Sequence, residues 1–324
     1  ARLMASGASH SSALTPAASA SSPDASSSAA AAPPASTSRA PATVFGQVVV
    51  GPPGSGKSTY CAGLKQFFGL VNRDVAVINL DPANDRRAPY DPAVDINDLI
   101  DVEVAAEQHG LGPNGSMIYC MEYLDKNIDW LVDRLSLLQG KYLIFDLPGQ
   151  VELYTHHNAV KNILEVLQKL DMRLTCVNLI DSHYCTDPSK YVSALLLSLT
   201  TMLHIELPHV NVLSKIDILE NYGELPFSLE FFTDVGDMRY LLDLLDADPA
   251  TRRMSTLNAK LCELVEDFPY TRFYTLNIED KDSVLAVVKV VDKANGYIFA
   301  DLDAARAQLE RGVQGRGGVQ GRPA

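Results

Sequence analysis

Short apolar runs alternate with amphipathic stretches along the middle of the chain. The runs have the length of strands and occupy residues 44–50, 74–80, 141–146, 173–181, 209–215 and 272–277. Helical patterns lie between them, for example at residues 57–69, 127–138 and 159–170. Strands that alternate with helices pair in parallel through right-handed crossovers, with helices on both faces. The pattern therefore predicts an α/β fold with a mainly parallel sheet, in which ligands bind at the carboxyl ends of the strands.

Two segments add to this alternation. Residues 191–205 are the most apolar helical stretch, and at 15 residues they are too short to span a bilayer, so we expect a buried helix. Residues 219–270, between the fifth and sixth runs, also have helical patterns. This insert either covers the core or offers a surface for a partner or a dimer. The sequence leaves both interpretations open.

The two ends of the chain differ in composition from the middle. Residues 1–43 are mostly Ala, Ser and Pro, and residues 301–324 are expected to hold a helix end followed by a Gly/Arg/Gln-rich tail. Neither end has enough apolar side chains to offset the entropy of ordering, so we expect both tails to be disordered. One domain is then predicted at residues 44–300. The Ser-rich, acid-poor N-terminal tail leaves a transit peptide open as an alternative.

The charge of the chain narrows the classes of function. The formal net charge is −13, and because residues 1–43 and 311–324 carry +1 and +3, residues 44–310 carry −17. An acidic domain argues against direct binding of nucleic acid. The cysteines show no CxxC pair and are expected to be reduced thiols of an intracellular, soluble protein. They are Cys61, Cys120, Cys176, Cys185 and Cys262.

A glycine-rich stretch follows the first predicted strand and begins the first predicted helix. It matches G-x-x-x-x-G-K-[ST] and consists of Gly51, Pro52, Pro53, Gly54, Ser55, Gly56, Lys57, Ser58 and Thr59. The backbone N–H groups of such a loop surround phosphate oxygens, and the helix N-terminus adds its positive dipole end. Lys57 is expected to reach the β- and γ-phosphates, and the Ser58 hydroxyl to bind Mg²⁺. The sequence thus predicts a P-loop NTPase, a three-layer sandwich.

Two further predicted strands end in acidic motifs. The third ends in DLPGQVE, where Asp146 is expected to bind Mg²⁺ and the Gly149 N–H to meet the γ-phosphate. Gln150 has the spacing of the glutamine that orients the attacking water in GTPases, and Glu152 is a second candidate contact to that water. The second strand ends in LDPAND, where Asp81 is expected near the metal, with a simple Asp-Pro turn as the alternative.

The fifth predicted strand ends in a motif of the form [NTS]-K-x-D, made by Ser214, Lys215 and Asp217. A carboxylate can accept two hydrogen bonds from guanine N1–H and N2–H₂, whereas adenine offers no such pair of donors. The Lys215 stem is expected to lie across the base, and Asn277, after the sixth strand, to lie in a base-contacting loop. These residues predict a guanine nucleotide. The nearby stretch DSHYCTDP, residues 181–188, is interpreted as a structural loop.

The stretch LGPNGS, residues 111–116, is typical of a tight turn. Taken in order, GxxxxGK[ST], Asp-Pro-Ala, Gly-Pro-Asn, DxPGQ and [NS]KxD resemble the GPN-loop GTPase family over residues 44–300. The resemblance implies a dimer in which the Gly112-Pro113-Asn114 loop of one subunit reaches the nucleotide pocket of the other. The amide of Asn114 would then lie near the γ-phosphate.

The resemblance also implies an activity and partners. The chain would hydrolyse GTP to GDP and phosphate with Mg²⁺, using as catalytic residues Lys57, Asp81, Asn114, Gln150 and Glu152. It would pair with itself or with GPN-loop GTPase paralogues, and act in assembly and nuclear import of RNA polymerase II and related polymerases, through their subunits or assembly factors. No membrane is implied, and the expected location is the cytoplasm, with shuttling to the nucleus left open. The alternatives are a nucleotide-dependent dimerising scaffold with little hydrolysis and a P-loop phosphotransferase.

Overall fold

The computed structural model describes residues 43–84, 88–235, 237–249, 251–268 and 271–300. The predicted tails at residues 1–42 and 301–324 therefore lie outside the described residues.

The described chain builds a parallel sheet of seven strands in the order β3-β2-β4-β1-β5-β6-β7. The strands are β1 Val44–Val50, β2 Val75–Asn79, β3 Val94–Asp95, β4 Tyr142–Asp146, β5 Met172–Asp181, β6 His209–Ser214 and β7 Phe273–Thr275. All six apolar runs form strands, as predicted. The sequence did not predict β3, because a strand of two residues leaves no periodic pattern. The central strand β1 pairs with β4 on one side and with β5 on the other, which explains its continuous apolar run.

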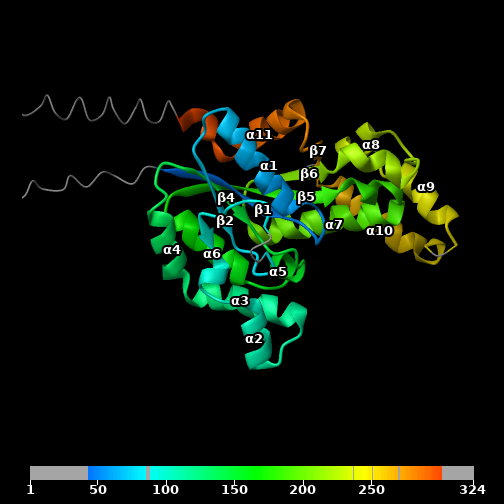
Figure 1. Cartoon of the computed structure of the whole chain (residues 1–324). Coiled ribbons are helices and arrows are strands. Elements are labelled where there is room, and N and C mark those ends of the chain that lie inside the picture. Colours follow the sequence, from blue (N-terminus) through cyan, green and yellow to red (C-terminus); the bar gives the residue numbers. More distant parts are fainter. Residues whose placement is uncertain (1–42, 85–87, 236, 250, 269–270, 301–324) are drawn as a thin grey trace, which may run out of the picture. The chain divides into compact units, whose positions relative to one another are not determined.

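Helices cover both faces of this sheet (Figure 1). They are α1 Lys57–Leu70, α2 Val102–His109, α3 Pro113–Lys126, α4 Ile128–Ser136, α5 Glu152–Thr155, α6 Ala159–Lys169, α7 Pro188–Ile205, α8 Leu229–Asp234, α9 Arg239–Ala247, α10 Ser255–Glu266 and α11 Lys281–Asn295. Because side chains alternate along a strand, Val49 packs toward α1 and α11, whereas Val48 and Val50 pack toward α3, α4 and α6. The three-layer sandwich is confirmed.

The predicted insert is helical and contains α8, α9 and α10. One side of it shares a core with α7, where the Tyr191 hydroxyl donates to the Phe232 carbonyl at 2.7 Å. Elsewhere on the insert, Tyr240 and Leu257 are 59% and 53% exposed. The core-covering interpretation therefore holds for one side, while the exposed apolar residues leave the partner-surface interpretation as a prediction.

The apolar stretch at residues 191–205 lies within α7, and much of it is buried. Among the residues described, none of the helices has the length and hydrophobicity that a membrane span requires. All five cysteines are free and buried, as expected of core thiols. Burial raises the pKa of Cys185 to about 12, so this thiol is protonated at neutral pH.

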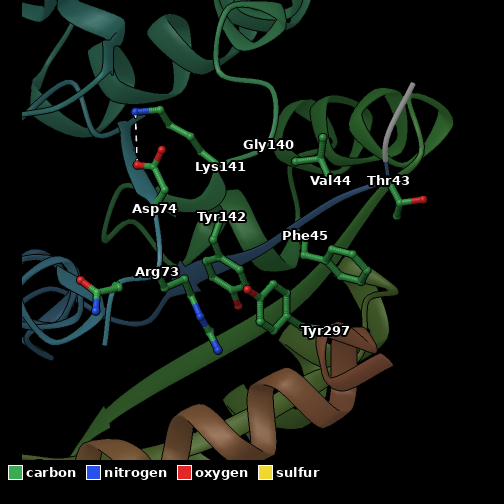
Figure 2. A pocket seen from close by; sticks show the side chains of 10 residues that line it. Thr43, Val44, Phe45, Arg73, Asp74, Gly140, Lys141, Tyr142 and Tyr297 are labelled. Carbon is green, nitrogen blue, oxygen red and sulfur yellow. Dashed lines mark ion pairs between the residues drawn. The ribbon is translucent and has the colours of Figure 1, made fainter. Parts of the chain in front are cut away.

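A small cavity of about 170 Å³ lies at the amino ends of β1, β2 and β4 (Figure 2). Beside it, Arg73 forms a bidentate pair with Asp292 at 3.0 and 2.7 Å. The Arg73 guanidinium also lies over the rings of Phe68, Tyr142 and Tyr297. Its donors are engaged in fixing α11 to the sheet, so the cavity provides no unpaired cation from Arg73 for a ligand.

Candidate functional site

The glycine-rich loop connects the carboxyl end of β1 to the first turn of α1. Gly51, Gly54 and Gly56 have φ values of 144°, 78° and 91°, which residues with a side chain rarely adopt. A Cβ on Gly51 would also lie 2.3 Å from the Leu179 carbonyl oxygen. The N-cap of α1, Gly56, provides no side-chain hydrogen bond, so the first N–H groups of the helix have no capping side chain. A loop of this kind presents backbone donors to an anion.

Lys57 lies inside this loop and is almost completely buried. Burial lowers the pKa of Lys57, while the carboxylates of Asp146 and Asp81 act in the opposite direction. Within the described residues it forms no ion pair, and its Nζ reaches the Pro52 carbonyl oxygen only at 3.5 Å. A buried cation with one weak partner is suited to a phosphate. In the same loop, the buried Ser55 hydroxyl has no hydrogen-bond partner, and Thr59 is exposed.

The DLPGQ loop after β4 lies directly against the glycine-rich loop. A Cβ on Gly149 would lie 3.0 Å from Lys57 Nζ and 3.1 Å from Pro53 Cα, so a side chain would push the two loops apart. Gln150 follows at a half-buried position and Glu152 begins α5 at an exposed one. The structure therefore brings Gly149 and Lys57 together, as the sequence suggested. The role of Gln150 and Glu152 toward a water molecule stays a prediction.

Asp146 and Ser58 lie next to each other at the ends of β4 and the glycine-rich loop. The Asn84 amide joins them, since its Nδ2 donates to Ser58 Oγ at 2.9 Å and to Asp146 Oδ2 at 3.0 Å. The Tyr90 hydroxyl donates to the same Asp146 oxygen at 2.6 Å. The other oxygen, Oδ1, is buried without a partner. Burial raises the pKa of Asp146, and the hydrogen bonds and Lys57 oppose that effect.

This arrangement fits Mg²⁺. An unpaired carboxylate oxygen and a hydroxyl are hard ligands of the kind that Mg²⁺ takes, and phosphates and water normally complete its shell. In the described part of the chain, no group of three or more His, Cys, Asp or Glu is arranged to hold a metal, so the protein would provide only a few of the ligands. Asp146 and Ser58 are therefore the protein ligands that the geometry supports best.

Asp81 occupies the turn after β2 that the Asp-Pro alternative predicted. Its Oδ1 accepts from the Ala83 N–H at 2.9 Å, and its carbonyl oxygen accepts from the Asn84 N–H at 3.0 Å. The residue is nevertheless buried, and burial raises the pKa of Asp81, with the nearby carboxylate of Asp146 adding to the effect and Lys57 opposing it. Asp81 therefore shapes the turn and lies close to the candidate metal ligands. Direct ligation of Mg²⁺ by Asp81 stays a prediction.

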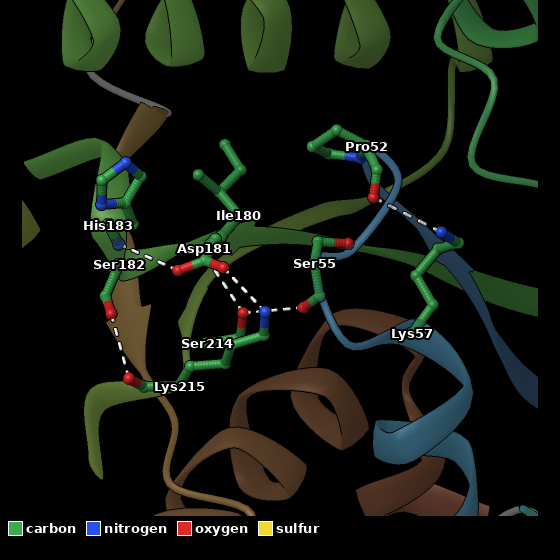
Figure 3. Close-up of polar contacts among 9 residues, drawn as sticks. All are labelled: Pro52, Ser55, Lys57, Ile180, Asp181, Ser182, His183, Ser214 and Lys215. Atoms are coloured by element: carbon green, nitrogen blue, oxygen red, sulfur yellow. Dashed lines mark hydrogen bonds and ion pairs between the residues drawn. The ribbon is translucent and has the colours of Figure 1, made fainter. Parts of the chain in front are cut away.

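The [NTS]-K-x-D motif lies beside the glycine-rich loop (Figure 3). The buried Ser214 hydroxyl donates to the Ser55 carbonyl at 2.8 Å, with the Ile180 carbonyl as a second acceptor at 3.2 Å. The side chain of Asp217 is exposed, as a residue that reads a ligand should be. The loop after β7 joins this region, because the Leu276 carbonyl accepts from the Ile216 N–H at 3.4 Å.

Asn277, in that same loop, is held by its own surroundings. Its N–H donates to Ser283 Oγ at 2.9 Å, and its Oδ1 accepts from the Glu279 N–H at 2.9 Å. The side chain is therefore engaged in shaping the loop. A contact of the Asn277 side chain with a base stays a prediction. The part of this loop that contacts the [NTS]-K-x-D motif is its backbone, at the Leu276 carbonyl.

The Gly-Pro-Asn stretch corrects one expectation. It is the N-terminus of α3 rather than a separate tight turn, since Gly112 is the N-cap with φ −75° and Pro113 is the first helical residue. The reason is that proline suits the first helical position, where its missing N–H costs nothing. The left-handed residue is Gly110, which ends α2 with φ 62°. Gly112, Pro113 and Asn114 are all exposed.

Sequence reasoning missed some residues that the structure places in the site. Asn84 and Tyr90 contact Asp146, and Asp181 pairs with Lys215 at 2.8 Å. Asp181 is the last residue of β5, and its place at a carboxyl strand end was a signal that the interpretation of residues 181–188 as a structural loop did not use. Tyr90 follows the LDPAND motif in the connection before β3 and is not at a strand end, so it offered no such signal.

Comparisons with known proteins find relatives that cover most of the chain. The chain matches the family described as "Conserved hypothetical ATP binding protein" over residues 49–297. It is 56% identical over 270 residues to "GPN-loop GTPase QQT1" of Arabidopsis thaliana, which covers 83% of this chain and 90% of the relative. It is 53% identical over 272 residues to "GPN-loop GTPase 2" of Danio rerio, covering 84% and 87%.

Solved structures with a similar fold include the following one. It is a GTPase in apo form from Pyrococcus abyssi, with a TM-score of 0.63 and 24% sequence identity, covering 78% of this chain and 98% of that one. This likeness supports the architecture alone.

Proposed function

The chain belongs to the GPN-loop GTPase family, and from that premise we propose that it works as a dimer whose GTP cycle controls a protein partner. The resemblance to this family, and within it to GPN-loop GTPase 2, is confirmed by relatives that cover most of the chain. The protein is a GTP hydrolase with a P-loop. Binding of GTP and GDP follows from the family, whereas Mg²⁺, the dimer and the partner belong to the proposal.

One observation supports guanine triphosphate most directly. The hydrogen bond of 2.8 Å between Ser214 Oγ and the Ser55 carbonyl joins the base motif to the glycine-rich loop. A nucleotide with its phosphates in that loop therefore has its base beside Asp217, whose carboxylate accepts from guanine N1–H and N2–H₂. The acidic charge of residues 44–310 repels polyanions in general, so the phosphates depend on the local donors of the loop and on Lys57.

The residues suggest how the hydrolysis proceeds. The loop N–H groups and Lys57 hold the β- and γ-phosphates. Gly149 lies against Lys57 and Pro53 of this loop, from where its N–H would meet the γ-phosphate. Gln150 orients a water whose oxygen bonds to the γ-phosphorus while the bond to the bridging oxygen breaks, giving GDP and phosphate. Ser58 and Asp146 would hold Mg²⁺, with Asp81 nearby, and the ion would neutralise charge on the phosphates.

The dimer completes this site with Asn114. The residue is exposed at the start of α3, and in the described part of the chain its side chain makes no hydrogen bond. A free amide on a rigid helix N-terminus can be presented to a second copy of the chain, where it donates to the γ-phosphate region. A preorganised donor of this kind stabilises the charge that develops in the transition state.

Asn114→Ala is expected to lower GTP turnover about 10- to 100-fold, because a transition-state donor is lost, while nucleotide affinity changes little. Single-turnover hydrolysis and calorimetric titration with GDP measure the two effects. Asn158→Ala is the matched control, since Asn158 is also exposed at the start of a helix and makes no capping hydrogen bond. A parallel loss of turnover and affinity would instead indicate a role in folding.

We also propose the biological setting that the family resemblance implies. The partners would be GPN-loop GTPase paralogues and subunits or assembly factors of RNA polymerase II and related polymerases, met in the cytoplasm with shuttling to the nucleus. The insert, which exposes Tyr240 on α9 and Leu257 on α10, is a candidate surface for such a partner. Copurification of polymerase subunits with the unchanged chain, but not with Tyr240→Asp, is the expected result.

Single-turnover hydrolysis with purified protein separates this function from its two alternatives. Release of phosphate from GTP, faster when a partner is present, supports the GTPase cycle. Tight GTP binding with no release under any condition would instead indicate a dimerising scaffold. Transfer of labelled phosphate to an added nucleotide or polynucleotide would indicate a phosphotransferase.

A further inference from the structure

Lys215 is held at both ends by residues from the end of β5 (Figure 3). Its Nζ pairs with Asp181 Oδ2 at 2.8 Å, and its carbonyl oxygen accepts from Ser182 Oγ at 3.0 Å. The backbone of Lys215 is left-handed, with φ 60°, a conformation that is uncommon for residues other than glycine. One contact to its side chain and one to its backbone therefore hold Lys215, which has a backbone conformation that it would not adopt by preference.

The position in which Lys215 is held lies along the glycine-rich loop. A Cβ on Gly56 would lie 3.9 Å from Lys215 Cε, so the lysine stem runs beside the start of α1. The preceding residue, Ser214, is bonded to the Ser55 carbonyl of the same loop. The stem consequently flanks the place where the nucleoside lies once its phosphates are in the loop.

The ion pair with Asp181 determines whether a ligand meets the ammonium or the methylene stem of Lys215. The side chains of Lys215 and Asp181 are 33% and 17% exposed, so solvent screens their attraction only in part. With the ammonium directed to the carboxylate, the charge is neutralised locally and the methylene stem remains as a flat apolar surface. A base packs on such a stem, whereas a free ammonium would move toward the phosphates.

From this geometry we propose that Asp181 is a positioning residue for guanine recognition, which holds the Lys215 stem in place before the nucleotide binds. The inference rests on the proposed binding of GTP and adds a residue outside the [NTS]-K-x-D motif to the determinants of base affinity. Asp181 acts through Lys215 and does not itself touch the nucleotide.

The two carboxylate oxygens of Asp181 have separate tasks, which permits a clean substitution. Oδ1 accepts from the His183 N–H at 2.9 Å and caps the short helix Ser182–Thr186, whereas Oδ2 pairs with Lys215. Asp181→Asn keeps a carbonyl oxygen for the cap and removes the charge. The local fold should therefore survive, and the melting temperature checks that it does.

The test compares a ligand that has a base with one that lacks it. In calorimetric titrations with Mg²⁺ present, Asp181→Asn is expected to weaken binding of GDP about tenfold, because the lysine is no longer fixed. Binding of inorganic tripolyphosphate, which has no base, should stay within about twofold. Asp74→Asn is the matched control, since Asp74 pairs with Lys141 at 3.4 Å at the amino end of the sheet.

A second pair of variants tests whether Asp181 acts through the lysine. Lys215→Met keeps an apolar stem and removes the ammonium, so adding Asp181→Asn to it should change GDP affinity less than about twofold. Ser182→Ala, which releases the Lys215 carbonyl, should weaken GDP but not tripolyphosphate. Equal losses for both ligands, or additive losses in the double variant, would overturn the inference. Failure of the unchanged chain to bind GDP would overturn the proposed function instead.

Discussion

Lys57→Ala is expected to weaken GTP binding about 100-fold and to lower its turnover about a further 1000-fold. The reason is that Lys57 is a buried cation with no ion pair among the described residues, so its ammonium is available to the β- and γ-phosphates. The alanine side chain offers no hydrogen-bond donor in place of the ammonium. Calorimetric titration and single-turnover hydrolysis measure the two losses.

The same substitution should leave the fold intact. Burial lowers the pKa of Lys57, which means that the folded chain disfavours the charged form, and removal of the charge therefore should not reduce the free energy of unfolding. Lys65→Ala, on the same helix with its Nζ bonded to the Asp91 carbonyl, is the control and should keep full activity. Loss of GTP binding accompanied by a lower melting temperature would show that Lys57 supports the fold rather than the ligand.

Asp217→Asn is expected to lower affinity for GTP about 100- to 1000-fold and to raise affinity for xanthosine triphosphate. The asparagine NH₂ would face the guanine N1–H and N2–H₂ groups, donor against donor. Xanthine has a carbonyl oxygen at position 2, which accepts from that NH₂. Competition of the two triphosphates for the variant measures the change in preference.

Because Asp217 is exposed, its substitution should not change the melting temperature. Asp237→Asn provides a control at another exposed, acidic position, in the insert. An unchanged preference for GTP over xanthosine triphosphate would remove Asp217 from base recognition. The glycine-rich loop would then specify a triphosphate without specifying guanine.

Much of this architecture follows from the sequence because strands buried on both faces leave a strong signal. The run VFGQVVV became β1 with the predicted bounds, since both faces of the central strand are covered by helices. The phosphate loop was equally recognisable, because all three of its glycines have backbone angles that other residues rarely adopt. Local chemistry was sufficient in both cases.

The parts that could not be predicted depend on contacts between distant segments. Tyr90 and Asn84 meet at Asp146 only because β2, β3 and β4 are adjacent in the sheet, and neither residue type signals such a meeting. The Gly-Pro-Asn stretch was misjudged for a different reason. Turns and helix N-termini use the same residues, and the helical pattern of α3 after Pro113 was not weighed against the turn.

The central claim is that the glycine-rich loop and Asp217 together bind a guanine triphosphate, although the matching family is described as ATP-binding. The most direct test is displacement of fluorescent GDP from the unchanged chain by competing nucleotides in the presence of Mg²⁺. We predict that GTP and GDP displace the label at least about 100-fold more effectively than ATP, since adenine lacks the paired donors that the carboxylate requires. Equal displacement by ATP and GTP would contradict the account.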